Sequence, residues 1–165
     1  MALPSSGSIS LSQVNVELDL TATASINMGS AAVRGLFDIA SGAISMSNGY
    51  GKANAFAFTQ TIASSVQNYN LRTAMIAAGY AGSGAFTATV TINSGVYIWS
   101  DSTSTAGFDT GSLSGGTINI TNNGFIIGKG GIGSSVHTTS GGAGGNAMSI
   151  SQNVNITNNS FIAGG

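Results

Sequence analysis

One short sequence pattern occurs twice in the second half of the chain. Residues 119–126 read Asn-Ile-Thr-Asn-Asn-Gly-Phe-Ile, and residues 155–162 repeat them with Ser in place of Gly. A weaker copy, Ile92–Ile98, precedes both. In each copy a β-branched segment enters a turn of Asn and Gly, residues that tolerate left-handed backbone angles, and an apolar segment leaves it. Stacked copies would align Asn side chains in ladders and bury Ile and Phe in one interior, which predicts a mainly β fold of a β-solenoid-like or interdigitated kind.

Two full copies make a short array. Free-standing solenoids usually need three or more repeats, because each repeat can bury its apolar side chains only against a neighbour. Further copies of the chain can supply the missing neighbours, and oligomerisation buries surface that a small domain leaves exposed. We therefore expect an oligomer, and specifically a homotrimer.

The first region, residues 1–54, contains most of the helical signal. Ser10 and Gln13 form a capping-box pattern ahead of one short helix, and Ser30 precedes a second. Isolated helices shorter than about 12–15 residues are marginal in water, so both need packing partners. We expect them to dock on a partner protein, although a self-contained helical cap would also explain them. The candidate docking residues are the apolar ones on the two helix faces: Leu11, Val14, Leu18, Val33, Leu36 and Phe37.

Two β-rich regions follow, at residues 55–101 and 102–165. In the first, Phe86–Ile92 alternates apolar and polar side chains as a strand does, and Val96–Trp99 predicts another strand. Leu71–Ala78 predicts a short helix, which makes this region α+β. The second region carries both full copies of the repeat. The chain is thus predicted to place a small helical region before two regions of β structure.

Two glycine-rich segments, residues 128–133 and 141–145, separate the full copies of the repeat. Glycine-rich sequence forms a flexible linker by default. The alternative is close backbone packing, in which the missing side chains let extended segments approach one another. Apolar residues resume at Ala147, Met148 and Ile150, so we favour an ordered loop.

Charged residues are scarce, and this excludes several classes of protein. Only 5% of the 165 residues are charged and the net charge is -1, so the chain has no basic patch for nucleic acid or for an anionic membrane. No stretch approaches the ~18–20 apolar residues of a membrane span, and the N-terminus lacks the features of a signal peptide. We therefore expect synthesis in the cytoplasm without a signal peptide, no membrane insertion and no nucleic-acid partner.

Few residues could carry catalysis. Asp101 and Asp109 are the only carboxylates in the β-rich regions, and a glycoside hydrolase needs two that flank the scissile bond. Turn formation in an exposed loop is the simpler role for both. His137 is the only histidine and there is no cysteine, which leaves little from which to build a metal site. We predict a protein that is not an enzyme, with no catalytic, cofactor-binding or metal-binding residues.

Aromatic side chains at alternate positions of one predicted strand raise the possibility of sugar binding. Tyr97 and Trp99 are candidates for glycan stacking, because flat aromatic rings suit the apolar side of a sugar ring. Phe108 and Phe125 extend the set. Aromatic residues spaced in this way more often form core, and at the level of sequence we favour that interpretation.

Much of the chain resembles virion structural proteins of tailed bacteriophages. The stretches that carry the resemblance are Ala2–Gly7, Ile9–Asn15, Ala31–Arg34, Ala43–Lys52, Asn68–Arg72, Val90–Trp99 and Ile118–Gly131. Proteins of this kind are tail fibre, tail tip or baseplate components, with an N-terminal attachment segment and a glycine-rich distal part. The resemblance implies a place in the phage tail and docking of residues 1–54 on other tail or baseplate proteins. Because no signal peptide is expected, release from the host would occur by lysis.

Together these observations predict a structural component of a phage tail. It would be a fibre or baseplate-attached protein that docks through residues 1–54, projects its β-rich regions and contributes to host recognition. One alternative is a receptor-binding adhesin proper, whose Gly/Asn-rich loops contact a host surface glycan or an outer-membrane protein. The other alternative is a polysaccharide depolymerase that uses Asp101 and Asp109.

Overall fold

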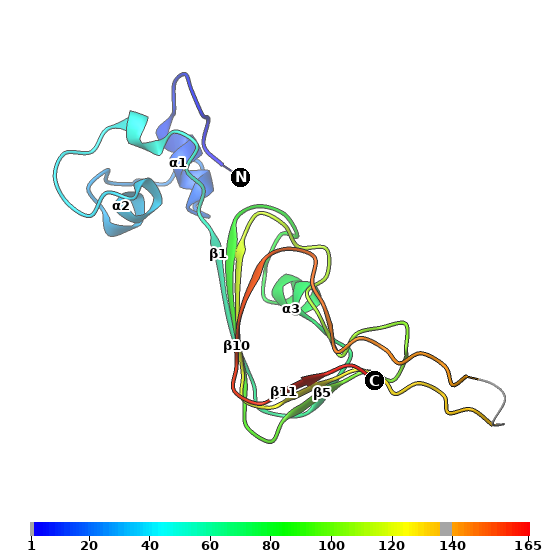
Figure 1. The fold of residues 1–165 in the computed structure, drawn as a ribbon. Coiled ribbons are helices and arrows are strands. Elements are labelled where there is room, and N and C mark those ends of the chain that lie inside the picture. Colours follow the sequence, from blue (N-terminus) through cyan, green and yellow to red (C-terminus); the bar gives the residue numbers. More distant parts are fainter. Residues whose placement is uncertain (1, 136–139) are drawn as a thin grey trace. The chain divides into compact units, whose positions relative to one another are not determined.

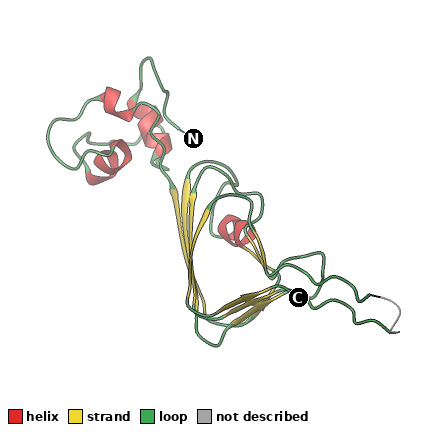
Figure 2. Ribbon diagram, in the orientation of Figure 1, coloured by secondary structure: helices red, strands yellow, loops and turns green. Residues whose placement is uncertain are grey.

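The structure, a computed structural model, describes residues 2–135 and 140–165 (Figures 1 and 2). The chain divides into two compact units, Met1–Ala55 and Phe56–Gly165. Short helices make up the regular structure of the first unit, and strands dominate the second. The predicted mainly β fold with few helices is therefore confirmed. In the described residues, no helix has the length and apolar character needed to cross a membrane.

The first unit contains three short helices: α1 (Leu11–Glu17), α2 (Ala31–Phe37) and the 3-10 helix η1 (Met46–Gly49). The predicted capping box at the start of α1 is confirmed. The Gln13 amide donates to Ser10 Oγ at 3.2 Å, and the Ser10 amide donates to Gln13 Oε1 at 2.8 Å. Ser30 caps α2, because its Oγ accepts from the Val33 amide at 3.4 Å. Local hydrogen bonds thus fix where both helices begin.

Most of the predicted docking residues lie inside the first unit. Four of them are buried in the core of the first unit: Val14, Val33, Leu36 and Phe37. Leu18 packs against this core from its edge, and of the predicted set Leu11 alone is exposed, at 46%. The apolar faces of the two helices share this core with the N-terminal segment, and docking through these residues stays a prediction.

The second unit winds through three parallel sheets (Figure 1). The first sheet contains, in order, β1 (Phe56–Ile62), β4 (Phe86–Ile92), β7 (Thr117–Asn122) and β10 (Val154–Asn158). The second contains β2 (Val66–Gln67), β5 (Tyr97–Trp99), β8 (Phe125–Ile127) and β11 (Phe161–Ala163). The third contains β3 (Tyr69–Asn70), β6 (Phe108–Asp109) and β9 (Met148–Ser149). Each pass through the sheets, here called a winding, lies against the previous one, and strands from residues 55–101 and 102–165 share all three sheets.

Inward-facing side chains of successive windings align in columns between the sheets. Val90 pairs in register with Ile120, and Ile120 with Ile156. Helix α3 (Leu71–Ala77), which follows β3, adds Leu71 and Met75 to the same core, and both are 0% exposed. Fully burying one such side chain stabilises the fold by about 1.5–3 kcal/mol, so stacked windings hold one another in place.

The predicted asparagine ladders are present in the last two windings. Three hydrogen bonds join side-chain amides of residues 36 positions apart. Their donors and acceptors are Asn155 and Asn119 at 2.9 Å, Asn122 and Asn158 at 2.8 Å, and Asn159 and Asn123 at 2.8 Å. Asn122 is 0% exposed, and its Oδ1 also accepts from the Gly124 amide at 3.1 Å. This ladder therefore joins neighbouring windings and closes the turn within one of them.

Two details of the repeat differ from the prediction. The rings of Phe125 and Phe161 stack outside the coil, with centroids 5.8 Å apart, while the Ile that follows each of them faces the interior. Successive strand residues point to opposite faces, so a Phe-Ile pair cannot bury both side chains. The turns of the two full copies also lack the predicted left-handed backbone angles. Gly124 is needed for space instead, because a Cβ there would lie 2.7 Å from the oxygen of Asn93 in the turn of the preceding winding.

The buried Tyr69 phenol should make the second unit sensitive to alkaline pH. Tyr69 is 7% exposed and donates to Gln60 Oε1 at 2.5 Å, and burial raises the pKa of this phenol above its ordinary value. In the unfolded chain the phenol loses its proton at a pKa of about 10. The free energy of unfolding is therefore unaffected below that pH and falls above it, by up to about 1.4 kcal/mol per pH unit. Urea unfolding on either side of this pH should show the loss. Tyr69→Phe should remove most of it, and an unchanged loss in the variant would contradict this assignment.

Candidate functional site

The longest departures from regular winding occur at two places: between β3 and β4, where residues 71–85 include α3, and at the corner between the second and third sheets. There the first winding turns through Asn68, the second through residues 100–107 and the third through residues 128–147. In repeat folds, insertions gathered on one face commonly form the binding face. This site, the insertion corner, is defined by Asn68 and residues 100–107, 128–135 and 140–147.

The third insertion forms a projection of two extended segments, the finger, residues 128–135 and 140–147 (Figure 1). The Gly145 amide donates to the Lys129 carbonyl oxygen at 2.7 Å, and the Gly142 amide donates to that of Ile132 at 2.7 Å. This pattern makes the two segments antiparallel. Ile132 is 82% exposed, so the finger presents an apolar side chain to its surroundings.

Close backbone packing explains the glycines of the finger. A Cβ at Gly131 would lie 2.9 Å from the carbonyl carbon of Gly142, and one at Gly128 would lie 2.8 Å from that of Asn146. Real Cβ atoms essentially never show separations below 3.0 Å. The structure therefore fits the close-packing interpretation of these segments better than the linker interpretation.

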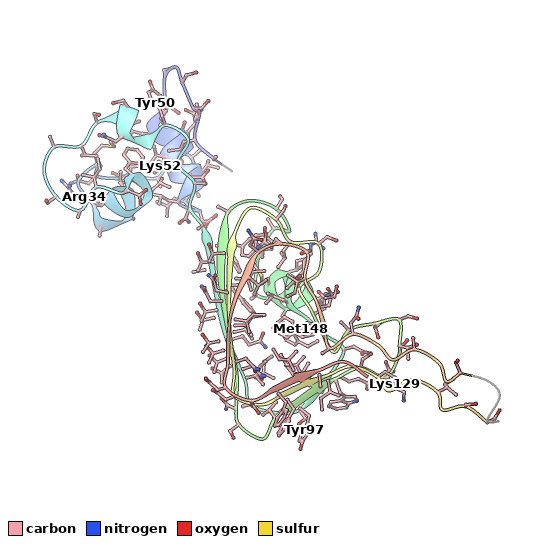
Figure 3. All side chains as sticks on the ribbon, in the orientation of Figure 1. Arg34, Tyr50, Lys52, Tyr97, Lys129 and Met148 are labelled. Atoms are coloured by element: carbon pink, nitrogen blue, oxygen red, sulfur yellow. The ribbon has the colours of Figure 1, made fainter. Side chains whose placement is uncertain are left out.

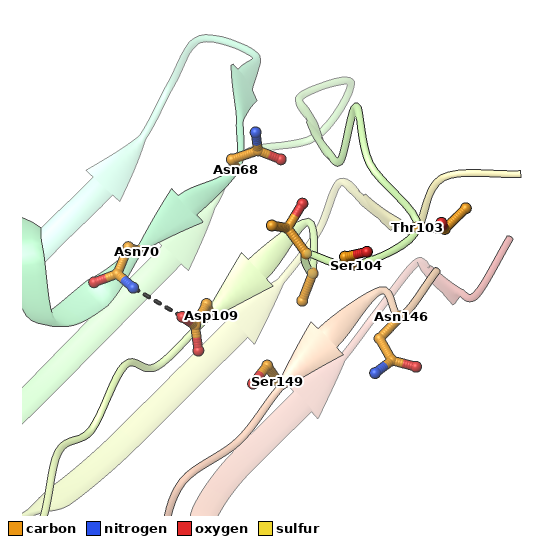
Figure 4. Close-up of a pocket in the computed structure, with 9 residues that line it drawn as sticks. Asn68, Asn70, Thr103, Ser104, Asp109, Asn146 and Ser149 are labelled. Carbon is orange, nitrogen blue, oxygen red and sulfur yellow. Dashed lines mark hydrogen bonds between the residues drawn. The ribbon is translucent and has the colours of Figure 1, made fainter. Parts of the chain in front are cut away.

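A polar pocket of about 330 Å³ lies at the base of the insertion corner (Figure 4). Its lining comes from the first three windings: Asn68, Asn70, Thr103, Ser104, Thr105, Ala106, Asp109, Asn146 and Ser149. Asn70, Asp109 and Ser149 occupy equivalent positions on β3, β6 and β9, so they form one polar row across the third sheet. Sequence reasoning missed this row, because each member stands in a strand of only two residues, which is too short to show alternation.

The two carboxylates considered for hydrolysis are held by asparagine side chains. Asn68 Nδ2 donates to Asp101 Oδ1 at 2.8 Å, and Asn70 Nδ2 donates to Asp109 Oδ2 at 2.9 Å (Figure 4). Asp109 lines the pocket, whereas Asp101 does not. Both residues act as acceptors that fix neighbouring segments. Asp101 is exposed in a loop, as the simpler interpretation predicts, whereas Asp109 is half-buried on β6. His137 lies outside the described residues.

Outward-facing aromatic rings cover the second sheet next to this corner. The ring of Tyr97 stacks on that of Phe125, with centroids 4.5 Å apart and an angle of 10° between the ring planes. Two residues further along β5, Trp99 is in register with Ile127 of β8. Tyr97 is 46% exposed and Trp99 37%, and Figure 3 shows Tyr97 on the outside of the coil. The core interpretation is therefore wrong for these two residues. The aromatic patch is defined by Tyr97, Trp99, Phe125, Ile127 and Phe161.

The core interpretation holds for Phe108, which is 0% exposed. Its position on β6 faces the interior, between the equivalent residues Tyr69 and Met148 of the neighbouring strands. Phe108 is thus removed from the set of sugar-stacking candidates, and Phe125 remains in it.

A family model described as phage tail fibre adhesin Gp38 matches residues 57–165, well over half of the chain. The chain belongs to this family. The predicted tailed-phage tail fibre family is thereby confirmed, on a match that includes the insertion corner, the pocket and the aromatic patch. No curated protein and no solved structure matches the chain.

Membership of the Gp38 family bears on several of the predictions. A tail fibre adhesin is a virion protein that associates with other tail proteins and takes part in host attachment, and Gp38 is a family of adhesins, not of enzymes. The Gp38 match leaves the first unit, Met1–Ala55, outside its bounds. Docking through residues 1–54, a baseplate position and the homotrimer stay predictions.

Proposed function

We propose that this Gp38 chain is a receptor-binding adhesin whose insertion corner contacts the host surface. The observation that carries the proposal is the finger, in which two segments pack backbone to backbone at one corner of an otherwise regular coil. A projection that is already ordered loses little conformational entropy on binding. The stacked windings behind it, which we regard as a β-solenoid-like arrangement, give the corner a rigid support.

The aromatic patch supports a glycan as part of the host target. Tyr97 ends a stack of parallel rings that continues through Phe125 to Phe161, so one face of the Tyr97 ring is not covered by the stack. Trp99 lies beside the insertion corner, because its carbonyl oxygen accepts from the Asn68 amide at 2.8 Å. A sugar chain bound at the corner can therefore extend over Trp99 and Tyr97, while an outer-membrane protein would meet the finger.

Replacing residues 129–144 with a short Gly-Ser linker tests the proposed function. The purified wild-type chain should compete with intact phage for host cells, and the chain without its finger should not. A variant at the opposite corner, Asn93→Ala/Ser94→Ala, should compete as the wild type does. Undiminished competition by the fingerless chain would sink the proposal, provided that its thermal unfolding matches that of the wild type.

We further infer that the first unit attaches the adhesin to the fibre through the exposed side of α1. An apolar pocket of about 330 Å³ lies there, lined among others by Leu3, Pro4 and Val16. Val16 is 49% exposed and Leu11 46%, whereas most of the docking residues predicted from sequence are buried. A side chain of the fibre protein inserted in this pocket would cover Val16.

Val16→Asp should reduce incorporation of the adhesin into virions about tenfold or more, because it places a charge in an apolar contact that must lose its water. Thr23→Asp, which adds the same charge at an exposed position of the same unit, is the matched control. Immunoblots of purified virions give the measurement. Normal incorporation of Val16→Asp would exclude this surface as the attachment site.

A further inference from the structure

We propose that the polar pocket of the insertion corner is a saccharide site, which binds an uncharged sugar ring through Asn70, Asp109, Asn146 and Ser149. The proposal deepens the proposed function and rests on it for its biological setting. The pocket lies over the third sheet and the aromatic patch lies over the second, so this site is distinct from ring stacking at Tyr97 and Trp99.

Several side chains of the pocket have hydrogen-bonding capacity that the protein leaves unused. Within residues 2–135 and 140–165, the side chains of Asn146, Ser149, Thr103 and Ser104 make no hydrogen bond to another residue. An amide offers donors and an acceptor, and each hydroxyl offers one donor and acceptor lone pairs. These groups reach the pocket from the second and third windings, so only a ligand or water can satisfy them together.

Two other side chains of the pocket are fixed in place by the protein. Asn70 Oδ1 accepts from the Thr73 amide at 2.9 Å as the N-cap of α3, while Asn70 Nδ2 donates to Asp109. Asp109 Oδ1 accepts from the Gly111 amide at 2.9 Å. Each carboxylate oxygen therefore holds one donor and keeps acceptor capacity for a ligand. Side chains locked in this way bind without losing further rotamer freedom.

The chemistry of the lining selects the class of ligand. No lysine or arginine of the described chain lines the pocket, which argues against a phosphate or carboxylate ligand. The described residues contain no group of three or more potential metal ligands, and Asp109 is the only carboxylate in the lining. The lining instead places hydrogen-bond donors and acceptors side by side and contains no cationic side chain among its described residues. This arrangement matches sugar hydroxyls, because each hydroxyl both donates and accepts.

The size of the pocket sets the expected affinity. A volume of about 330 Å³ is at the small end of the range for ligand pockets, roughly 300–1,000 Å³, and suits one or two sugar rings. Polar contacts in such a small site give weak binding, with a Kd on the order of 1 mM. Weak sites are sufficient for an adhesin because several fibres acting together convert them into firm attachment.

Titration of the isotope-labelled full chain with methyl glycosides of glucose, galactose, mannose and N-acetylglucosamine tests the proposal by NMR. At least one glycoside should shift the backbone amide signals of Asp109, Asn146 and Ser149 in a saturable way. Asn146→Ala/Ser149→Ala removes two hydrogen-bonding side chains and should weaken this binding about tenfold. Asn93→Ala/Ser114→Ala removes the same groups from exposed positions outside the pocket and should bind as the wild type does.

Two results would overturn the proposal: no saturable shift at these amides with any of the four glycosides, or equal affinity of the pocket variant and the wild type. Its failure is distinguishable from failure of the proposed function. If the fingerless chain loses competition for host cells while no glycoside binds, the adhesin role stands and the saccharide pocket falls. If a glycoside binds the pocket while the fingerless chain competes normally, the pocket stands and the role of the finger falls.

Discussion

Phe108→Ala should destabilise the second unit by about 3–5 kcal/mol, the range expected for truncating a buried phenylalanine. Phe108 is 0% exposed on β6, and its ring centroid is 5.0 Å from that of Tyr69 in the preceding winding. Strands on both sides of β6 are hydrogen-bonded to it, so the windings cannot close together over the cavity. Urea unfolding followed by circular dichroism should show a lower midpoint with little change in slope.

Phe161→Ala is the matched control for this prediction. It deletes the same atoms from a ring that is 65% exposed and that contacts Phe125 in a stack on the outside of the coil. Loss of one aromatic contact at the surface should cost about 1 kcal/mol. Equal destabilisation by the two variants would contradict the division of these phenylalanines between core and aromatic patch.

The last two windings were predictable from sequence because they share one period. Asn122 and Asn158, and likewise Phe125 and Phe161, are separated by the same interval, so the ladder and the ring stack are visible as a repeat. Earlier windings depart from this period. The turn after β4 holds residues 93–96, whereas the turn after β7 holds only residues 123–124, and the insertion corner adds segments of different length to each winding.

The sequence was least informative where a pattern of apolar residues indicates burial but does not identify the surface against which they pack. Val14 and Val33 lie on apolar helix faces, and such a face packs equally well on its own unit or on a partner protein. Tyr97-Ile98-Trp99 is apolar throughout, so alternation could not show that only Ile98 faces the interior. The strands of the third sheet are too short for any alternation to be detected, which hid the polar row that contains Asp109.

Gly131→Val should reduce phage adsorption to its host about tenfold or more. A Cβ at Gly131 would meet the carbonyl group of Gly142 on the opposite segment, so the two segments of the finger cannot keep their hydrogen bonds. Overpacking of this kind costs about 1–3 kcal/mol, which is enough to separate the segments. Because the finger is an insertion between β8 and β9, thermal unfolding of the windings should change little. Adsorption rates of phage carrying the variant give the measurement.

Gly133→Val is the matched control for Gly131→Val, because it adds the same side chain to the finger without disturbing the packing of its two segments. Gly133 lies on the same segment as Gly131, but nothing lies within 4 Å of its Cβ position, so the same substitution should fit without moving the opposite segment. Protection of the finger amides from hydrogen exchange should fall in Gly131→Val and persist in Gly133→Val. Phage adsorption should likewise fall in Gly131→Val and stay normal in Gly133→Val. If Gly131→Val loses protection and still adsorbs normally, an ordered finger is not what the host surface recognises. Normal protection in Gly131→Val would contradict the close backbone packing itself.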